Sequence, residues 1–247
     1  MPVTFSALLE GKSGDGHGTG SFTTGSFTPT AGRRLVALVA GHDRGGSSAD
    51  VAAEFTITDS QGRTWTKRAE IGQTSGFWRN GIAAWISDEA AATSMTVTFD
   101  CGGVDLGQYY FGIFEITDSD GTVSGYVEAD GVPDDGAHSV VLGATPDAED
   151  LVVYARYMEG RDITGPTMPA GWTSVCDQTC VSGNEFGAFG VVVHDDFTSD
   201  TISITDMRPA GNGYDAMNCA FIIPAASEPE PPTVPMPRGN MAASMLI

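Results

Sequence analysis

Short apolar runs separated by turn residues recur along the whole chain of 247 residues. Residues 35–40 and 151–155 are continuous apolar stretches, which are typical of strands buried on both faces. Residues 55–58 alternate apolar and polar side chains, as strands with one buried face do. This pattern predicts roughly twelve to fourteen short strands and almost no helix, in an all-β sandwich of the jelly-roll type.

The turn residues predict two local features. Residues 59–62, with the sequence Asp-Ser-Gln-Gly, separate two strand-like runs and predict a β-hairpin that leads into Trp65. Residues 87–92 are long enough for a single helical turn, which Ser87 would cap.

The strand pattern occurs twice, at a constant offset of 107 positions. Trp65 aligns with Trp172, and Phe114 aligns with Phe221, within a stretch of about fifty residues that needs no gap. Farther upstream, residues 151–155 are expected to correspond to residues 35–39. We interpret this pattern as an internal duplication.

The duplication divides a body of residues 1–225 into two halves, at about 21–119 and 137–224. Each half could close its own small sandwich, or both could share one larger sandwich. Because each half offers only about six strands, the shared sandwich is favoured. The first half is longer around residues 43–48, where we expect a longer loop.

Residues 226–247 differ in composition from the body. Five prolines lie between positions 229 and 237, which favours an extended polyproline spacer. The spacer leads to an apolar segment whose large side chains are Met241, Met245, Leu246 and Ile247. This segment is suited to docking into a partner's groove or extending a partner's sheet edge. A frayed tail without a partner is the alternative.

The charge of the chain limits its partners. Twelve Lys and Arg stand against 32 Asp and Glu, which gives a formal net charge of −20. Such a surface repels nucleic acids and anionic membrane surfaces. The N-terminal residues have no signal-peptide pattern, and no apolar run is long enough for a membrane span. We therefore expect synthesis in a cytoplasm, no membrane insertion and no nucleic-acid partner.

The cysteines do not indicate a disulfide scaffold, because four are too few for a chain of this length. Cys176 and Cys180 fall in a predicted loop, where they could bridge locally or stay reduced.

No catalytic or cofactor-binding signature is present. The histidines are scattered, none at zinc-binding spacing, and no serine-hydrolase elbow occurs. Asp118 and Asp120 precede Gly121 as in the opening of a calcium loop, but the downstream ligands are missing, so a turn is favoured over a metal site. We expect a protein that is not an enzyme and binds no cofactor. A glycan-degrading enzyme with a carboxylate pair is a third, less favoured class.

The strongest candidate for a contact surface is a short stretch that combines aromatic and polar side chains. Its residues are Phe77, Trp78, Arg79 and Asn80. Aromatic rings with neighbouring Arg and Asn offer stacking and polar contacts to a sugar or a partner subunit. At the offset of 107 the second half has a different sequence, so the shared fold does not require these residues. Asp43 and Arg44, at the longer loop of the first half, are further candidates for ligand or partner contact.

The pattern resembles β-sandwich proteins encoded by tailed bacteriophages and related gene transfer agents. The resemblance rests on residues 27–31 (Phe-Thr-Pro-Thr-Ala) leading into residues 35–36, on residues 58–65 (Thr-Asp-Ser-Gln-Gly-Arg-Thr-Trp) and on residues 84–85 (Ala-Trp). It spans about residues 20–120 and extends more weakly into the second half.

The resemblance implies a virion structural protein, displayed on the head or tail as a decoration, spike, fibre or tail-tip component. It implies other virion proteins as partners, a homo-oligomer, and in some cases contact with host surface polysaccharide. Synthesis would take place in the cytoplasm of the bacterial host, and the mature location would be the virion. The alternative is a carbohydrate-binding module that is not part of a virion, with Trp78 as its stacking residue.

Overall fold

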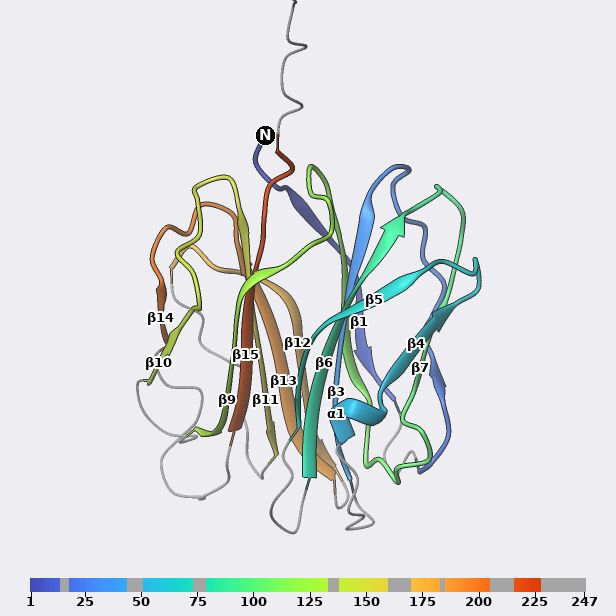
Figure 1. The fold of residues 1–247 in the computed structure, drawn as a ribbon. Helices are drawn as coiled ribbons and strands as arrows, with labels where there is room; N and C mark the ends of the chain where they lie inside the picture. The colour runs from blue at the N-terminus through green and yellow to red at the C-terminus, as the bar shows by residue number, and fades with distance from the viewer. Residues whose placement is uncertain are drawn as a thin grey trace, which may run out of the picture.

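The computed structural model describes residues 1–13, 18–43, 51–72, 79–132, 138–159, 170–182, 185–204 and 216–227. In these ranges the chain forms antiparallel strands arranged in four sheets, together with one four-residue helix, α1 (Val51–Glu54). The all-β sandwich predicted from the sequence is confirmed (Figure 1).

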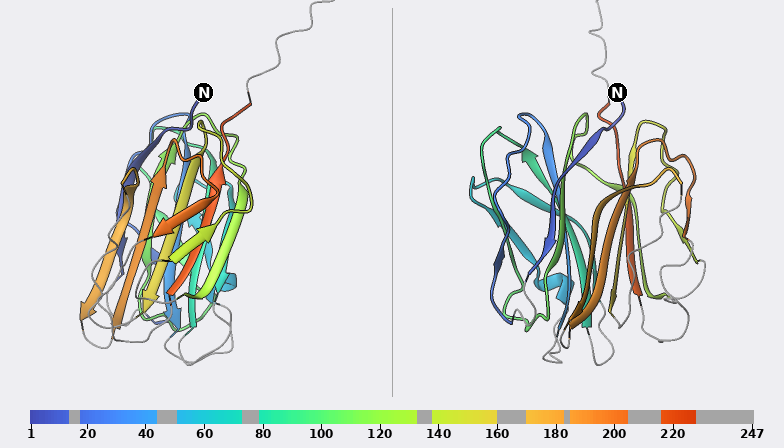
Figure 2. Two further views of the ribbon diagram at one scale, coloured as in Figure 1. Left: turned by 90° about the vertical axis from the view of Figure 1, so that its left-hand side faces the viewer. Right: turned by 180° about the vertical axis from the view of Figure 1, so that it is seen from behind.

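Two five-stranded sheets form the centre of the molecule (Figures 1 and 2). The first large sheet has the order β1 (Phe5–Lys12), β8 (Tyr110–Ile116), β3 (Arg34–Asp43), β6 (Arg79–Glu89), β5 (Trp65–Gly72). The second large sheet has the order β12 (Thr173–Ser182), β13 (Glu185–His194), β11 (Leu151–Glu159), β15 (Ala216–Ile223), β9 (Ser124–Val132).

A smaller sheet covers the outer face of each large sheet. The first outer sheet consists of β2 (Phe22–Thr23), β7 (Val97–Asp100) and β4 (Thr56–Asp59). The second outer sheet consists of β10 (His138–Val141) and β14 (Thr201–Ile204). In the first half, β1, β8, β3 and β6 lie side by side in the large sheet, while β2 pairs with β7 outside it. In the second half, β9, β15, β11 and β13 lie side by side in the same way, while β10 pairs with β14 outside the large sheet. This is the strand order of a jelly roll.

The apolar runs form strands with both faces buried, as the sequence predicts. In β3, Val36 and Leu38 face the second large sheet, whereas Leu35 and Ala37 face the first outer sheet. Alternate side chains of one strand therefore enter two different cores. The exposed fraction of all four side chains is 0%.

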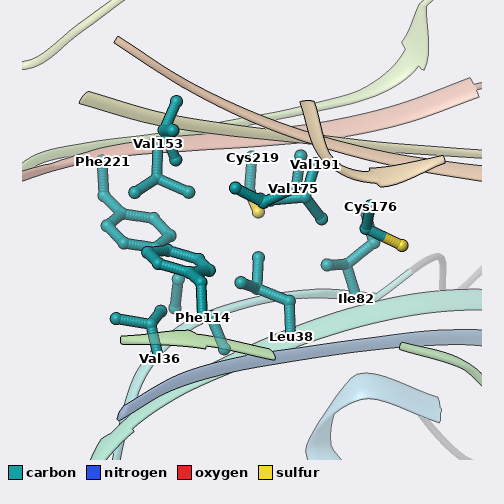
Figure 3. Packing of buried hydrophobic residues seen from close by; sticks show 14 of the residues in the cluster. Val36, Leu38, Ile82, Phe114, Val153, Val175, Cys176, Val191, Cys219 and Phe221 are labelled. Carbon is teal, nitrogen blue, oxygen red and sulfur yellow. The ribbon is translucent and has the colours of Figure 1, made fainter. Parts of the chain in front are cut away.

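The core between the two large sheets contains residues of both halves (Figure 3). Phe114 of β8 and Phe221 of β15 point toward one another across this core. Val36 pairs with Phe114 in the first large sheet, and Val153 pairs with Phe221 in the second. Since both halves bury apolar area here, each stabilises the other.

The halves match in detail at the offset of 107. A β-bulge between Lys67 and Ala69 recurs between Ser174 and Cys176, at the same offset. The strand pairing makes Val36 equivalent to Val153, so the expected match of residues 35–39 with residues 151–155 is wrong by one position. The common topology is a property of the structure; its origin in a duplication stays an interpretation.

The described residues combine both geometries that the sequence left open. The two large sheets share a core, and each also packs on its own outer sheet around a separate core. The favoured single sandwich therefore describes the central pair of sheets and leaves out the two outer sheets.

The hairpin predicted at residues 59–62 is wrong. β4 pairs with β7, whereas β5 pairs with β6, so the segment crosses from the first outer sheet to the first large sheet. The turn chemistry itself is present, because the Gln61 N–H donates to Asp59 Oδ1 at 2.6 Å and Gly62 has a φ of 69°. The Trp65 indole N–H donates to Asp59 Oδ2 at 2.6 Å and fixes the crossing.

The helical turn predicted at residues 87–92 is also wrong. β6 continues to Glu89, and Ser87 Oγ accepts a hydrogen bond from the Leu35 N–H at 3.0 Å instead of capping a helix. Pairing with β3 and β5 on both sides outweighs the weak helical preference of a six-residue stretch.

The extra length of the first half accommodates regular structure that the sequence did not predict. α1 lies between β3 and β4, where only a longer loop was expected, whereas β4 matches the strand predicted at residues 55–58. α1 packs closely on Gly81, at which a Cβ atom would lie 2.6 Å from Ala52 N. Residues 44–50 lie outside the described ranges.

Candidate binding site at the loop end

The molecule has two distinct ends. At one end, the cross-strand pairs Asp43–Arg79, Lys12–Tyr110 and Glu159–Gly187 mark where strands of both large sheets start and finish. We call this end the loop end; it lies at the bottom of Figure 1. The opposite end carries residue 1 and the exit of residues 224–227, and we call it the terminal end.

The structure brings together candidates that are far apart in the sequence. Asp43 at the end of β3 pairs with Arg79 at the start of β6, and His42 pairs with Asn80. The two stretches predicted as contact surface therefore meet at the loop end. Asp43 and Asn80 are buried, with exposed fractions of 0% and 5%, so they belong to the framework beneath the surface. Arg44, Phe77 and Trp78 lie outside the described residues.

A buried polar cluster joins the two large sheets at this end. His42 Nδ1 lies 3.0 Å from the hydroxyl oxygen of Tyr157, which belongs to β11 of the opposite sheet. The Tyr157 ring packs against Tyr110 of β8, with ring centroids 5.6 Å apart. These three side chains are at most 2% exposed. They fix the relative position of the sheets beneath the loop end.

Gly187 gives the two tyrosines their space. A Cβ atom at this position would lie 2.8 Å from the Tyr110 hydroxyl oxygen and 3.0 Å from that of Tyr157. The sequence analysis missed this cluster, because His42, Tyr110 and Tyr157 come from three separate strands. Its only sequence signal is a polar or amphipathic residue at the end of each apolar run.

A second polar group lies on the outer face of the second large sheet. The Tyr154 hydroxyl donates to Asn218 Oδ1 at 2.6 Å, and Arg156 is the cross-strand neighbour of Asn218. All three side chains are at most 2% exposed. Burial raises the pKa of Tyr154, and the positive charge of Arg156 opposes this effect.

The first half is apolar at the equivalent places. By strand register, Ala37 is equivalent to Tyr154, Val39 is equivalent to Arg156, and Phe111 is equivalent to Asn218. The outer core of the first half is thus apolar and aromatic at these positions, whereas that of the second half also buries the polar side chains of Arg156 and Asn218. The two halves therefore differ in side-chain chemistry at these three positions, although their scaffold is shared.

Asp118 and Asp120 form turns at the terminal end. Asp118 has a φ of 54° and accepts a hydrogen bond from the Thr117 hydroxyl at 2.7 Å. Asp120 Oδ1 accepts both the N–H and the hydroxyl of Thr122, at 2.8 and 2.6 Å. These hydrogen bonds lower the pKa of Asp120. The carboxylates act as turn formers, which is the interpretation that the sequence favoured over a metal site.

The side chains of His194, Asp195 and Asp196 offer ligand atoms within 4.8 Å of one another. Their contacts are those of residues at the end of a strand, because β13 ends at His194. His194 Nδ1 lies 3.0 Å from Asp196 Oδ1 and accepts the Asp196 N–H at 3.3 Å. The ring packs against Trp172 and Phe197, with centroid distances of 5.4 and 5.3 Å. The imidazole is thus part of an aromatic cluster at the terminal end. His17 and the His138 side chain lie outside the described part.

The sequence predicted a loop at Cys176 and Cys180, and this prediction is wrong, because both residues belong to β12. Residues four apart in a strand are about 13 Å apart, which is too far for a disulfide between Cys176 and Cys180. Cys101, Cys176 and Cys219 are buried free thiols. Burial raises the pKa of Cys176, and it raises that of Cys219 to about 12, so neither thiol is a reactive nucleophile.

The terminal end fixes both ends of the described chain. The Val3 N–H donates to Glu149 O at 2.8 Å. The Ala225 N–H donates to Asp150 Oδ1 at 3.0 Å, and the Ala226 N–H donates to Asp118 O at 2.6 Å. Ala225 and Ala226 are therefore fixed at the terminal end, opposite the loop end. Met241, Met245, Leu246 and Ile247 lie outside the described residues.

No helix within the described ranges is long and apolar enough to cross a membrane. Comparison with known proteins found no match to a family model, to a curated protein or to a solved structure.

Proposed function

We propose that the protein is a non-enzymatic structural component of a tailed-phage particle or a related gene transfer agent. Residues 226–247 anchor it to other virion proteins, and the loop end points away from the particle. The display site is the head or the tail, and the loop end carries the contacts to host surface glycan.

The observation that carries this proposal is that residues 224–227, which precede the tail, and the loop end lie at opposite ends of the molecule. Ala225 and Ala226 are hydrogen-bonded at the terminal end, whereas Asp43 and Arg79 meet at the loop end. A body anchored by its tail at one end presents the other end to its surroundings (Figures 1 and 2). Such polarity suits a displayed protein.

The nature of the polar residues at the loop end supports a role in contact rather than catalysis. His42, Tyr157 and Arg156 are at most 2% exposed, so they support the surface instead of meeting a substrate. The formal charge of −20 is compatible with an external position and disfavours binding to packaged nucleic acid.

Deletion of residues 226–247 tests the anchor. Particles from cells that produce the truncated protein are expected to sediment without it, whereas full-length protein co-sediments. Thermal unfolding of the truncated protein shows whether the body is intact. Unchanged incorporation of the folded, truncated protein would contradict the proposal.

A carbohydrate-binding module outside a virion is the second candidate, favoured by the position of Arg79 at the loop end beside the stretch that contains Trp78. Binding to a glycan array that is lost in Trp78→Ala, without any association with particles, would support this function. Binding that survives Trp78→Ala removes Trp78 as the stacking residue.

A further inference from the structure

The two lateral edges of the large-sheet pair are equivalent by fold but differ in their side chains. At one edge β1 lies against β12, and at the other β9 lies against β5. We call the first the open seam and the second the filled seam. β1 and β9 are equivalent edge strands, as are β5 and β12, so the seams can be compared position by position.

Strand register gives the equivalent positions. Ser6 and Ser124 pair with Glu115 and Ile222, which are 107 positions apart. Each of the two edge strands has a bulge just after this pair. Leu8 of the open seam therefore corresponds to Tyr126 of the filled seam.

The strands facing them match in the same way. Their bulges make Ser174 equivalent to Lys67 and Val175 equivalent to Arg68. Tyr126 and Arg68 of the filled seam are thus larger than their counterparts Leu8 and Val175 of the open seam.

Tyr126 closes the filled seam. The Tyr126 hydroxyl bridges the sheets, because it lies within hydrogen-bonding distance of Glu70 O and 2.7 Å from Glu128 Oε2. Tyr126 thereby occupies the edge of β5 that a further strand would need. Lys67 does not contribute to this closure, because its Nζ donates to Ala52 O of α1 at 3.1 Å and lies 5.6 Å from the centroid of the Trp85 ring, on the outer face of the sheet.

The open seam is closed only on the side toward the loop end. There Glu10 accepts the Asp177 N–H at 2.7 Å, and Lys12 Nζ donates to Thr179 O at 2.5 Å. Toward the terminal end a groove of about 340 Å³ remains. It is lined by Ala7, Leu8, Leu9, Glu10, Ser174 and Val175.

The groove is suited to apolar side chains. Four of its six lining residues are apolar, and its volume is more than twice the ~150 Å³ of a cavity that accepts a benzene-sized group. It therefore has room for two or three side chains the size of Leu or Met. The shorter side chains at positions 8 and 175 leave this space, whereas the filled seam has Tyr126 and Arg68 at the equivalent positions.

We propose that the groove of the open seam binds residues 241–247 of a second copy of this chain. This segment has Met241, Met245, Leu246 and Ile247 as its large apolar side chains, and the described residues of the body leave few large apolar side chains exposed. The inference rests on the proposed anchoring role of the tail and names a neighbouring copy as its first partner.

The length of the spacer favours a second copy over the same chain. The groove lies near the terminal end, since Ser174 is the second residue of β12, and the chain also leaves the body at that end. Residues 228–240 in a polyproline conformation span about 40 Å at ~3.1 Å per residue. A stiff spacer of this length passes beyond the groove of its own body and reaches that of a neighbour.

Analytical ultracentrifugation of the full chain over a range of concentrations tests the proposal. The wild type is expected to self-associate. Ser174→Glu and Ala7→Glu, both at exposed positions of the open seam, should weaken self-association by roughly tenfold or more, as should Leu246→Glu. Thr66→Glu, at an exposed position of β5 on the filled seam, is the control and should leave it unchanged.

Mixing two variants distinguishes docking in trans from docking within one chain. Leu246→Glu keeps an intact groove and Ser174→Glu keeps an intact tail, so their mixture should regain one tail–groove contact and associate. A monomeric wild type, association that is insensitive to the groove variants, or mixtures that remain monomeric would each overturn the proposal. If the tail deletion still removes the protein from particles, the virion function stands and only the self-docking partner is wrong.

Discussion

Gly187 determines how the two large sheets meet at the loop end. Its missing side chain leaves room for the hydroxyl groups of Tyr110 and Tyr157, and the Tyr157 hydroxyl in turn contacts His42. A single hydrogen atom in place of a methyl group thus permits a polar link between strands of both halves.

Gly187→Ala is expected to destabilise the protein by roughly 1–3 kcal/mol, because the new methyl group would force the tyrosine rings apart. Denaturant-induced unfolding measures the change. Gly25→Ala is the control, since no atom lies within 4 Å of a Cβ at that position. Equal effects of both substitutions would contradict the role of Gly187.

Two exposed aspartates are expected to affect stability with opposite sign. Partial burial and the charge of Glu10 raise the pKa of Asp177, so its ionisation costs native-state stability. This cost is absent below the unfolded-state pKa near 3.8 and fully present above the raised native pKa. Hydrogen bonds from Thr122 lower the pKa of Asp120, which therefore stabilises above pH 3.8 and loses this effect as the pH falls through the lowered native pKa.

Asp177→Asn should therefore stabilise the protein at pH 7, and Asp120→Asn should destabilise it. Because both sites are exposed to solvent, each effect should be on the order of a few tenths of a kcal/mol. Both differences should shrink toward about pH 3, as the wild-type carboxylates become protonated. Melting curves of both variants over this pH range are the measurement, and the same sign for both at pH 7 would contradict the assignment.

At the residue scale, the sequence identified scaffold positions better than contact positions. Trp65 and Trp172 were recognised because they recur at one offset, and both pack against the outer cores. The contacts of His42 with Tyr157 depend on the pairing of distant strands, which residue type and spacing do not encode locally. Asp43 and Asn80 are contact candidates in the sequence, which reveals neither that strand pairing brings them to one end of the molecule nor that both are buried.

Among the elements, one buried carboxylate helps to hold the connection from β2 to β3. Glu115 of β8 is 3% exposed and accepts the N–H and the hydroxyl of Thr30 at 2.8 and 2.9 Å. It also forms an ion pair with Arg33 at 3.0 Å. Glu115 thus ties the segment 27–33 to β8 of the first large sheet, in addition to the backbone hydrogen bonds that join Phe27 to Met95 and Gly32 and Arg33 to Ala90.

Glu115→Gln is expected to cost roughly 1–3 kcal/mol, because it removes the charge that binds Arg33 and one of the acceptors used by Thr30. Chemical denaturation gives this value, and hydrogen exchange should show faster opening of residues 30–34. A loss of less than about 0.5 kcal/mol, which is usual for surface changes, would contradict the structural role of Glu115.

Strands were easier to predict than their partners. β3 and β11 followed from continuous apolar runs, because a strand buried on both faces has no polar side. The turn at residues 59–62 was also correct in its chemistry, but turn residues specify a reversal and not whether the flanking strands pair. Tertiary pairing places β4 and β5 in different sheets.

For the whole molecule, the shared core makes the two halves one folding unit. Phe114 and Phe221 belong to opposite halves and to the same core (Figure 3). Separated halves would expose this apolar face to water. The number of layers was not predictable from the sequence, since an apolar face does not reveal which sheet covers it.

We expect a single unfolding transition for both halves. Phe221→Ala should lower the stability of the whole protein by roughly 3–5 kcal/mol, because it removes a ring from the shared core. Calorimetry tests this expectation through the ratio of calorimetric to van't Hoff enthalpy, which is near one for a two-state transition. Two resolved transitions, with only the second half affected by Phe221→Ala, would show that the halves fold independently.

The polarity of the molecule is the central claim, and thiol labelling of assembled particles tests it most directly. Ala53→Cys places an exposed thiol beside the loop end, and Ala148→Cys places one at the terminal end, each in a Cys180→Ala background. Cys101, Cys176 and Cys219 are buried and should stay unlabelled. The account predicts that a maleimide labels the Ala53→Cys variant on particles as fast as in free protein, while the Ala148→Cys variant is protected. Protection of the loop-end thiol with free labelling of the terminal-end thiol would contradict it.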